Sequence, residues 1–107
     1  MNNKILLIIP TLNEFGNIQK IYKKVKKIFK KIDIIFIDDN STDGSKDVII
    51  NLTRKDKKVN YIFRKKKLGI GSAHKVGIKL AKKKKYRYVC TMDADGAHNP
   101  KYIKKML

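Results

Sequence analysis

Pairs of carboxylates follow two apolar stretches of this sequence. Residues 86–92 are largely apolar and end at Asp93-Ala94-Asp95, and an earlier apolar run ends at Asp38-Asp39. Side chains of an extended chain alternate with a period of two, so Asp93 and Asp95 would project to the same side. Like charges held that close repel each other, and a shared cation relieves the repulsion. A hard divalent ion that bridges to phosphate is the natural candidate, although an Asp-rich turn after a strand would show the same residues.

Four apolar runs have the length and composition of strands. The first, Lys4–Ile9, is stopped by Pro10 and is continuously apolar after its lysine, which is typical of a strand buried on both faces of a sheet. The other predicted strands are Ile32–Ile37, Lys58–Phe63 and residues 86–92. Continuous apolar runs of this kind belong to parallel sheets that helices cover on both sides.

The segments between the first three strands read as helices. From Ile18 to Phe29 the apolar residues recur at helical spacing, with lysines between them. The turn cluster Asn40–Gly44 then precedes a helix predicted over about 45–54. Asp43 or Ser45 can accept hydrogen bonds from the free amide hydrogens at the start of this helix.

Two further helices are predicted in the second half of the chain. Small and apolar residues from Ala73 to Ala81 form the stripe of a third helix, and Lys82–Lys85 ends it with cations at the negative end of its dipole. Asn99 and Pro100 match the N-cap and first position of a fourth helix.

The resulting order, β-α-β-α-β-α-β-α, predicts an α/β fold with a parallel sheet between two layers of helices. Ligands of such sheets bind outside the carboxyl ends of the strands. We therefore expect one edge of the sheet to gather the polar residues that follow the first, second and fourth strands, namely Asn13 and Glu14, Asp38 and Asp39, and Asp93 and Asp95.

Length and composition fit one globular domain. A chain of 107 residues has the usual size of a single domain, and its 42% hydrophobic content favours folding over disorder. The lone Cys90 cannot form an internal disulfide, which favours a reducing compartment. The apolar run Ile5–Ile9 is far shorter than the roughly 20 residues of a membrane span. We expect a protein of the cytoplasm or of the cytoplasmic face of a membrane.

The net charge of +18 favours a polyanionic partner, either nucleic acid or an anionic membrane surface. Only three of the 27 basic residues are arginine. A solvated coat of lysine, reflecting a bias in composition, is an equally good interpretation of the charge alone.

Other functional interpretations of the sequence motifs are less well supported. Gly69 and Gly71 lack a third glycine, since His74 stands at that position, and they follow the third strand, whereas a dinucleotide fingerprint requires the first. A phospho-acceptor receiver domain would place its acids after other strands. We expect His74 on the surface, whereas His98 is near enough to Asp95 to contact a metal or a diphosphate. We identify no cysteine and histidine cluster for zinc and no activated nucleophile.

Four motifs together resemble the nucleotide-sugar half of inverting family 2 glycosyltransferases. They are Ile9-Pro-Thr-Leu-Asn-Glu14, Phe36-Ile-Asp-Asp-Asn-Ser-Thr-Asp-Gly-Ser45, Arg64-Lys-Lys-Lys-Leu-Gly-Ile-Gly-Ser-Ala73 with Gly77, and Met92-Asp-Ala-Asp95 with His98 and Pro100. Each is weak alone, and their order over nearly the whole chain carries the resemblance. Within the family they look most like dolichyl- and polyprenyl-phosphate mannosyltransferases. The resemblance implies a three-layer, Rossmann-like sheet of the GT-A type, with residues 1–107 as its N-terminal half.

The resemblance also implies a site. Pro10 and Glu14 match positions that contact the nucleoside, and Asp39 matches an acid that accepts a hydrogen bond from the base or ribose. Asp93 and Asp95 match an Asp-x-Asp pair that faces the diphosphate and holds Mg²⁺ or Mn²⁺. The substrate-binding residues expected on this basis are Pro10, Thr11, Asn13, Glu14, Asp38, Asp39, Asp93, Ala94 and Asp95. The general base and the acceptor site are not identified in the chain.

The implied reaction is the transfer of a hexose, mannose from GDP-mannose in the mannosyltransferases, to a polyprenyl or dolichyl phosphate. Such an acceptor would bring the chain to a membrane, where its lysines would meet anionic lipid.

The sequence also departs from the family. Leu12 stands where many members have Tyr, and Ala97 stands where some have a Gln or Ser that assists the metal. Because the family's domain is roughly twice as long, we expect a truncated or split chain that binds the nucleotide sugar weakly and has no useful turnover alone. A second chain could complete the domain. Two alternative interpretations of the sequence are a basic nucleic-acid-binding α/β module and a nonfunctional fragment that aggregates through the open edge of its sheet.

Overall fold

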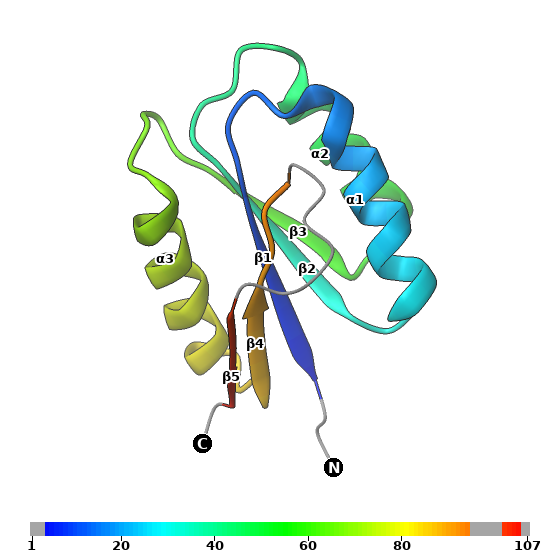
Figure 1. Ribbon diagram of the computed structural model, residues 1–107, viewed down its shortest axis with the longest axis vertical. Helices are drawn as coiled ribbons and strands as arrows, with labels where there is room; N and C mark the ends of the chain where they lie inside the picture. Colours follow the sequence, from blue (N-terminus) through cyan, green and yellow to red (C-terminus); the bar gives the residue numbers. More distant parts are fainter. Residues whose placement is uncertain (1–3, 95–101, 106–107) are drawn as a thin grey trace.

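The described part of the chain forms one five-stranded sheet with helices on both faces (Figure 1). This computed structural model describes residues 4–94 and 102–105, the last four through their backbone. The elements are β1 (Ile5–Thr11), α1 (Phe15–Ile28), β2 (Asp33–Asp38), α2 (Ser45–Lys55), β3 (Val59–Phe63), α3 (Ile70–Lys83), β4 (Tyr88–Thr91) and β5 (Tyr102–Lys105). The strand order is β3-β2-β1-β4-β5. The first four strands in sequence pair in parallel, and β5 pairs antiparallel to β4.

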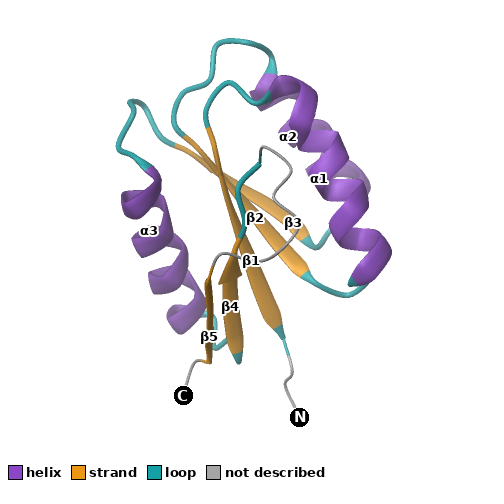
Figure 2. Ribbon diagram, viewed as in Figure 1, coloured by secondary structure: helices purple, strands orange, loops and turns teal. Residues whose placement is uncertain are grey.

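The central strands β1 and β2 are buried from both sides because almost all of their residues are apolar. Their alternating side chains enter two separate cores. Leu7 and Phe36 pack with residues of α1 and α2 on one face, whereas Ile8 and Ile35 pack with residues of α3 on the other. Figure 2 shows α1 and α2 together on one face and α3 on the opposite face. The predicted three-layer α/β architecture is therefore confirmed.

The helices bury different kinds of side chain. Helix α1 buries the apolar stripe of Ile18, Ile21 and Val25, as its spacing predicts. Helix α3 buries Ala73, Gly77 and Ala81, and these small residues let it approach the sheet closely. A Cβ atom added at Gly77 would lie 2.3 Å from Cδ1 of Ile8, so only glycine fits this contact without a shift.

Pro10 does not end the first strand, contrary to our prediction. The amide of Met92 donates to the carbonyl of Ile8, so the even positions of β1 direct their backbone groups toward β4. The pairing of β1 with β4 ends at Ile8, opposite Thr91. The missing N–H of Pro10 therefore faces a position that has no ladder partner and costs no hydrogen bond. On its other side β1 stays paired with β2 as far as Thr11.

We predicted a helix after Asn99 and Pro100. This prediction is wrong for residues 102–105, which form the strand β5. These residues pair with β4 from Tyr88 opposite Lys105 to Thr91 opposite Tyr102. A helix of about two turns has little stability of its own. The free edge of β4 instead offers a row of unpaired backbone groups that an added strand satisfies. Asn99 and Pro100 themselves lie outside the described residues.

No helix in the described part of the chain has the length and apolar character needed to cross a bilayer. Cys90 lies in β4 and is buried, and its burial raises the pKa of the thiol to about 11. It therefore acts as a small core residue.

Candidate functional site

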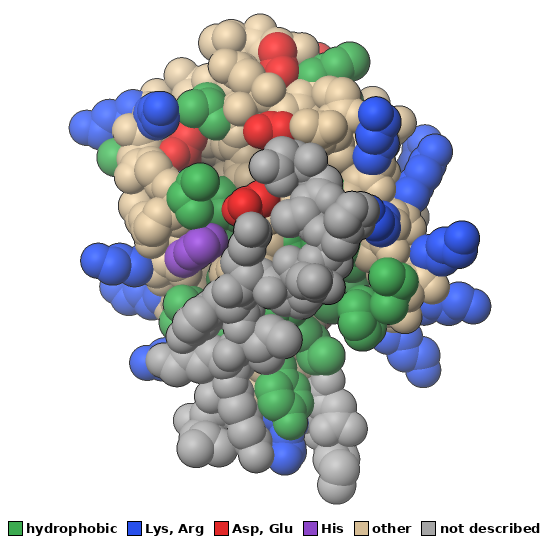
Figure 3. All heavy atoms as spheres, viewed as in Figure 1, with side chains coloured by type: hydrophobic (Ala, Val, Ile, Leu, Met, Phe, Trp, Pro, Cys, Tyr) green, Lys and Arg blue, Asp and Glu red, His purple; other side chains and the backbone are tan. Residues whose placement is uncertain are grey.

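A cavity of about 420 Å³ opens at the edge where the parallel strands end. Its volume is typical of sites for small ligands. The segments that follow β1, β2, β3 and β4 all contribute to its wall. The lining residues are Pro10, Thr11, Leu12, Glu14, Asp39, Lys67, Gly69, Ile70, Asp93 and Ala94. Figure 3 shows acidic side chains near the upper middle of this view of the molecule and basic side chains along its flanks.

The structure brings most of the predicted site residues to this one cavity. Glu14, Asp39 and Asp93, which follow three different strands, all line it, and so do Pro10, Thr11 and Ala94. Asn13 and Asp38 do not line it and instead hold the surrounding loops. Asp95 and His98 lie outside the described residues. The part that each residue plays in binding stays a prediction.

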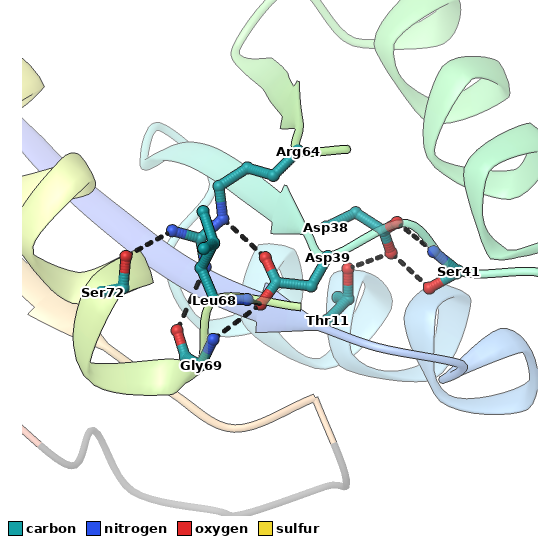
Figure 4. A network of polar contacts seen from close by, with 8 residues as sticks. All are labelled: Thr11, Asp38, Asp39, Ser41, Arg64, Leu68, Gly69 and Ser72. Carbon is teal, nitrogen blue, oxygen red and sulfur yellow. Dashed lines mark hydrogen bonds and ion pairs between the residues drawn. The ribbon is translucent and has the colours of Figure 1, made fainter. Parts of the chain in front are cut away.

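Asp39 is held in the cavity wall by Arg64 and by two backbone amides (Figure 4). Arg64 Nε donates to Asp39 Oδ1 at 2.5 Å, and the amides of Leu68 and Gly69 each donate to Oδ2 at 3.0 Å. Burial would raise the pKa of Asp39, but the hydrogen bonds from Arg64, Leu68 and Gly69 and the charge of Arg64 outweigh it and lower the pKa below 3.8. Asp39 is therefore ionised at neutral pH. A carboxylate oxygen can accept two hydrogen bonds, and Oδ1 accepts one, from Arg64 Nε.

The guanidinium of Arg64 also fixes the loop between β3 and α3. Its Nη1 donates to Ser72 Oγ at 2.7 Å, and its Nη2 donates to the carbonyl of Gly69 at 3.1 Å. The side chains of Arg64 and Asp39 are each only 8% exposed. Gly69 has a φ of +92°, a left-handed conformation that glycine adopts without strain. The set of contacts that Arg64 makes with Asp39, Gly69 and Ser72, here called the Arg64 clamp, thus shapes this side of the cavity.

Asp38 is fully buried and serves the neighbouring loops. Its Oδ1 accepts hydrogen bonds from Thr11 Oγ1 at 2.6 Å and from Ser41 Oγ at 2.5 Å, and its Oδ2 accepts the amide of Ser41 at 2.8 Å. A buried carboxylate is tolerated when its oxygens are satisfied in this way. Asp38 therefore joins the end of β1 to the loop after β2, on the side of that loop away from the Arg64 clamp (Figure 4).

Asn13 completes the connection between these loops. Its backbone amide donates to Ser41 Oγ at 2.7 Å, and its side-chain Oδ1 accepts a hydrogen bond from the backbone amide of Thr42 at 2.8 Å. Its φ of +55° is a left-handed conformation, which asparagine adopts more readily than most residues. Asn13 thus positions the neighbouring Glu14 from outside the cavity.

The loop after β2 also caps both nearby helices. Asp43 Oδ2 accepts the amide of Phe15 at the start of α1, and Asp43 Oδ1 accepts the amide of Ser45 at the start of α2. Ser45 Oγ accepts the amide of Glu14 at 3.1 Å. The predicted capping role of Asp43 is therefore confirmed, and the same carboxylate satisfies a second helix that sequence spacing could not indicate.

A divalent metal fits this site only in part within the described residues. Asp93 supplies a carboxylate, the oxygen ligand that Mg²⁺ and Mn²⁺ prefer. No group of three or more His, Cys, Asp or Glu in the described part of the chain could hold a metal ion. The second predicted ligand, Asp95, lies beyond that part, and a diphosphate would add oxygen ligands of its own.

Sequence reasoning missed several wall residues. Lys67 and Gly69 belong to the loop after β3, Ile70 begins α3, and Leu12 follows β1. Applying the rule for the carboxyl ends of parallel strands to β3 as well would have indicated the first three. His74, which we expected on the surface, is half-buried on α3, and its Nε2 has no hydrogen-bond partner within the described structure.

Comparison with known proteins points to one family. The model of the family described as "Glycosyl transferase family 2" matches residues 6–107. The undecaprenyl-phosphate mannosyltransferase of Micrococcus luteus is 30% identical over 97% of this chain and 43% of its own length. The polyprenol monophosphomannose synthase of Mycolicibacterium smegmatis is 32% identical over 97% of this chain and 40% of its own length. The chain thus spans less than half of these curated relatives.

Solved structures share the fold. A mannosyltransferase from Pyrobaculum calidifontis, in complex with GDP-Man and Mn²⁺, superposes with a TM-score of 0.75 at 19% identity, over 92% of this chain and 30% of its own. The glucosyl-3-phosphoglycerate synthase of Mycobacterium tuberculosis, in complex with Mn²⁺ and UDP, gives a TM-score of 0.68 at 18% identity, over 90% and 35% of the two chains. This level of identity supports the architecture, which is the GT-A type.

Proposed function

This chain belongs to glycosyltransferase family 2, and from that premise we propose that it is the donor-binding part of a hexosyltransferase. The proposed donor is GDP-mannose, and the proposed acceptor is a polyprenyl or dolichyl phosphate. Two curated relatives at 30% and 32% identity carry names that describe this chemistry.

The observation that carries the proposal is the convergence of Glu14, Asp39 and Asp93 on one cavity. Carboxylates from separate loops can accept hydrogen bonds from a nucleoside at one end and face a metal and a diphosphate at the other. We assign the nucleoside end to Glu14 and Asp39, because Asp39 Oδ1 can accept one more donor. Lys67, in the same wall, gives the diphosphate a cationic partner.

We assign the metal to Asp93 together with Asp95, as a site for Mg²⁺ or Mn²⁺. When bound, the ion would neutralise the charge that develops on the nucleoside diphosphate as the bond to the sugar breaks. The acceptor is itself an anionic phosphate and needs little activation by a base. We identify no acceptor site among the described residues, and we propose that a second chain or a further segment supplies it. The reaction would take place at the cytoplasmic face of a membrane.

Calorimetric titration of the purified chain with GDP-mannose, with and without Mn²⁺, tests this function. We expect weak binding that requires the metal, and we expect Asp95→Ala to abolish it. Asp47→Ala, an exposed change on α2, is the matched control and should bind like the unmodified chain. Unchanged binding by Asp95→Ala would remove that residue from the site. Transfer of radiolabelled mannose to polyprenyl phosphate by this chain alone would contradict the proposal that it lacks the acceptor half.

The net charge of +18 supports a second candidate function, binding of nucleic acid. Three arginines are a small share of the 27 basic residues, and Arg64 is engaged inside the protein. Binding of duplex DNA that persists at high salt, together with no response to GDP-mannose and Mn²⁺, would favour this function over sugar transfer.

A further inference from the structure

The loop between β3 and α3 exposes an unusual combination of side chains. We call residues 65–70, which are the end of this loop and the first residue of α3, the basic loop. Its three lysines are exposed, Leu68 is 47% exposed, and Ile70 is 57% exposed. A single exposed aliphatic residue is ordinary. Here two exposed aliphatic residues follow three exposed lysines within six residues, and together they form a surface that is both cationic and apolar.

This exposure is built into the fold. The backbone of the basic loop is anchored where its apolar residues lie, because the amides of Leu68 and Gly69 donate to the buried Asp39 and the carbonyl of Gly69 accepts from Arg64. These bonds fix the backbone of the loop in a conformation in which the Leu68 side chain is exposed. The protein thus uses a buried ion pair to hold an aliphatic side chain in water, where it gains nothing for the folded monomer.

The basic loop also lies beside the candidate site. Lys67, Gly69 and Ile70 line the cavity, whereas Lys65, Lys66 and Leu68 do not. In Figure 1 this loop lies at the same end of the sheet as the loops after β1 and β2. Whatever binds the outer residues of the basic loop is therefore held at the mouth of the cavity.

We propose that the basic loop docks this mouth onto an anionic lipid surface. Leu68 and Ile70 enter the interface between headgroups and acyl chains, and Lys65 and Lys66 contact the anionic headgroups. The inference deepens the proposed function and rests on it in one respect, since a lipid-linked phosphate acceptor would then approach the cavity from the surface on which the loop sits.

Charge and chemistry favour lipid over other polyanions. Lysine side chains place their charge in water while their methylene stems cover apolar surface, which suits a bilayer interface. A nucleic acid would instead call for aromatic residues that stack on bases or arginines that contact base edges, and residues 65–70 contain neither. A second copy of a chain with a net charge of +18 would be repelled.

Co-sedimentation with lipid vesicles tests the docking. The probes are vesicles of phosphatidylcholine alone and of phosphatidylcholine mixed with phosphatidylglycerol. The test variant combines Lys65→Gln, Lys66→Gln and Leu68→Ser. The matched control combines Lys27→Gln, Lys30→Gln and Ile28→Ser, which makes the same chemical change at the C-terminal end of α1, where Ile28 is 64% exposed. Circular dichroism checks that both variants keep the fold.

We expect the chain to bind the anionic vesicles and to release them as salt rises. The test variant should lose about a hundredfold or more in affinity, as the loss of two lysines and one leucine from an interface predicts. The control should lose at most the small share due to its two charges. Equal losses in both variants would attribute binding to the lysine coat as a whole and overturn the proposal. So would an absence of binding, or binding of duplex DNA that falls by the same factor in the test variant.

The vesicle result can be separated from the proposed function. None of the three substituted side chains lines the cavity, and the contact between Leu68 and Asp39 uses the backbone amide, which the substitution keeps. Binding of GDP-mannose and Mn²⁺ should therefore be the same in the test variant and the unmodified chain. If nucleotide binding fails while loop-dependent vesicle binding persists, the sugar-transfer proposal falls and the docking surface stands.

Discussion

Arg64 joins three parts of the chain through one guanidinium group. It contacts Asp39 after β2, Gly69 in the basic loop and Ser72 in the first turn of α3. Each contact uses a different nitrogen, and a lysine has only one nitrogen to offer. Arg64 therefore has the character of a positioning residue for the wall of the cavity.

Replacing Arg64 by alanine should lower the free energy of unfolding by about 3–5 kcal/mol, because it leaves the carboxylate of Asp39 buried without its ionic partner. Arg64→Lys should recover only part of this loss. Urea denaturation measures both effects. Arg54→Ala removes an exposed arginine from the end of α2 and is the control, with an expected change within about 0.5 kcal/mol. A loss for Arg64→Ala as small as that of the control would show that the clamp does not stabilise the fold.

Acid should weaken the fold through Asp39. Its pKa is lower in the folded protein than the ordinary 3.8, so the folded state binds fewer protons than the unfolded state in this range. The stability contributed by Asp39 is therefore fully present above its ordinary pKa and is lost as the pH falls through the lower, folded value. Asp56, whose pKa is also lowered despite its burial, by the amide of Lys58, the hydroxyl of Tyr22 and the ammonium of Lys26, adds to the same loss.

Urea denaturation at a series of pH values from neutral to acid measures this dependence. Asp39→Asn should be less stable at neutral pH and should show a shallower fall in acid, because the titrating group is gone. Asp47→Asn, which removes an exposed carboxylate from α2, is the matched control. A variant at Asp39 with an unchanged slope would contradict the assignment.

At residue scale, the sequence places Asp38 and Asp39 at the end of the second strand but does not say which one faces a ligand. Neighbouring residues of an extended chain project to opposite sides, so Asp38 and Asp39 could not both face the cavity. Asp38 binds Thr11 and Ser41 in the interior, and Asp39 faces the cavity. Those partners come from separate loops, and only the folded chain brings them together.

At the scale of elements, the contact between α3 and β1 depends on Gly77. The Cβ of an alanine there would lie 2.3 and 2.6 Å from two carbons of the fully buried Ile8, so the helix would have to move away from the sheet. Gly77→Ala should therefore lower the free energy of unfolding by about 1–3 kcal/mol, the usual cost of overpacking a core.

Gly71 provides the matched control for this prediction. It lies in the same helix, and an added Cβ would meet no atom within 4 Å. Gly71→Ala should be neutral or should stabilise the fold by up to about 1 kcal/mol, since alanine favours helices over glycine. Thermal denaturation of the two variants decides the point, and equal effects would show that the packing of α3 on Ile8 is looser than described.

Strands and helices could be predicted where the pattern was strong. The runs in β1 and β2 and the stripe in α1 are long and periodic, and each element appears close to its expected place. The two wrong predictions, the strand end at Pro10 and the helix after Pro100, depend on neighbouring strands that the local sequence does not reveal. Whether Pro10 ends a strand depends on which neighbour its missing N–H faces, and whether residues 102–105 pair with β4 depends on an edge that the rest of the chain creates.

At the scale of the whole molecule, the convergence of Glu14, Asp39 and Asp93 follows from topology. Right-handed parallel connections place the ends of β1, β2 and β4 at one edge, so this part of the site could be predicted without any knowledge of side-chain contacts. The wall formed by Lys67 and Ile70 could be predicted less well, because the clamp that holds their loop joins residues from three elements.

The chain matches less than half of its curated relatives, at 43% and 40% of their lengths. Weak, metal-dependent binding of the donor without transfer is what our proposal predicts for this chain.

Paramagnetic broadening of amide NMR signals, recorded as GDP-mannose and Mn²⁺ are added to the chain, tests the central claim most directly. Our account predicts that broadening will appear only when nucleotide and metal are both present. It should be strongest at Asp93 and Asp95 and in the loop that contains Lys67, and weaker at Glu14 and Asp39 at the nucleoside end of the cavity. Broadening that is strongest around Asp33 and Asp56, which lie near the start of β2 and the end of α2, would contradict it, as would spectra that do not change.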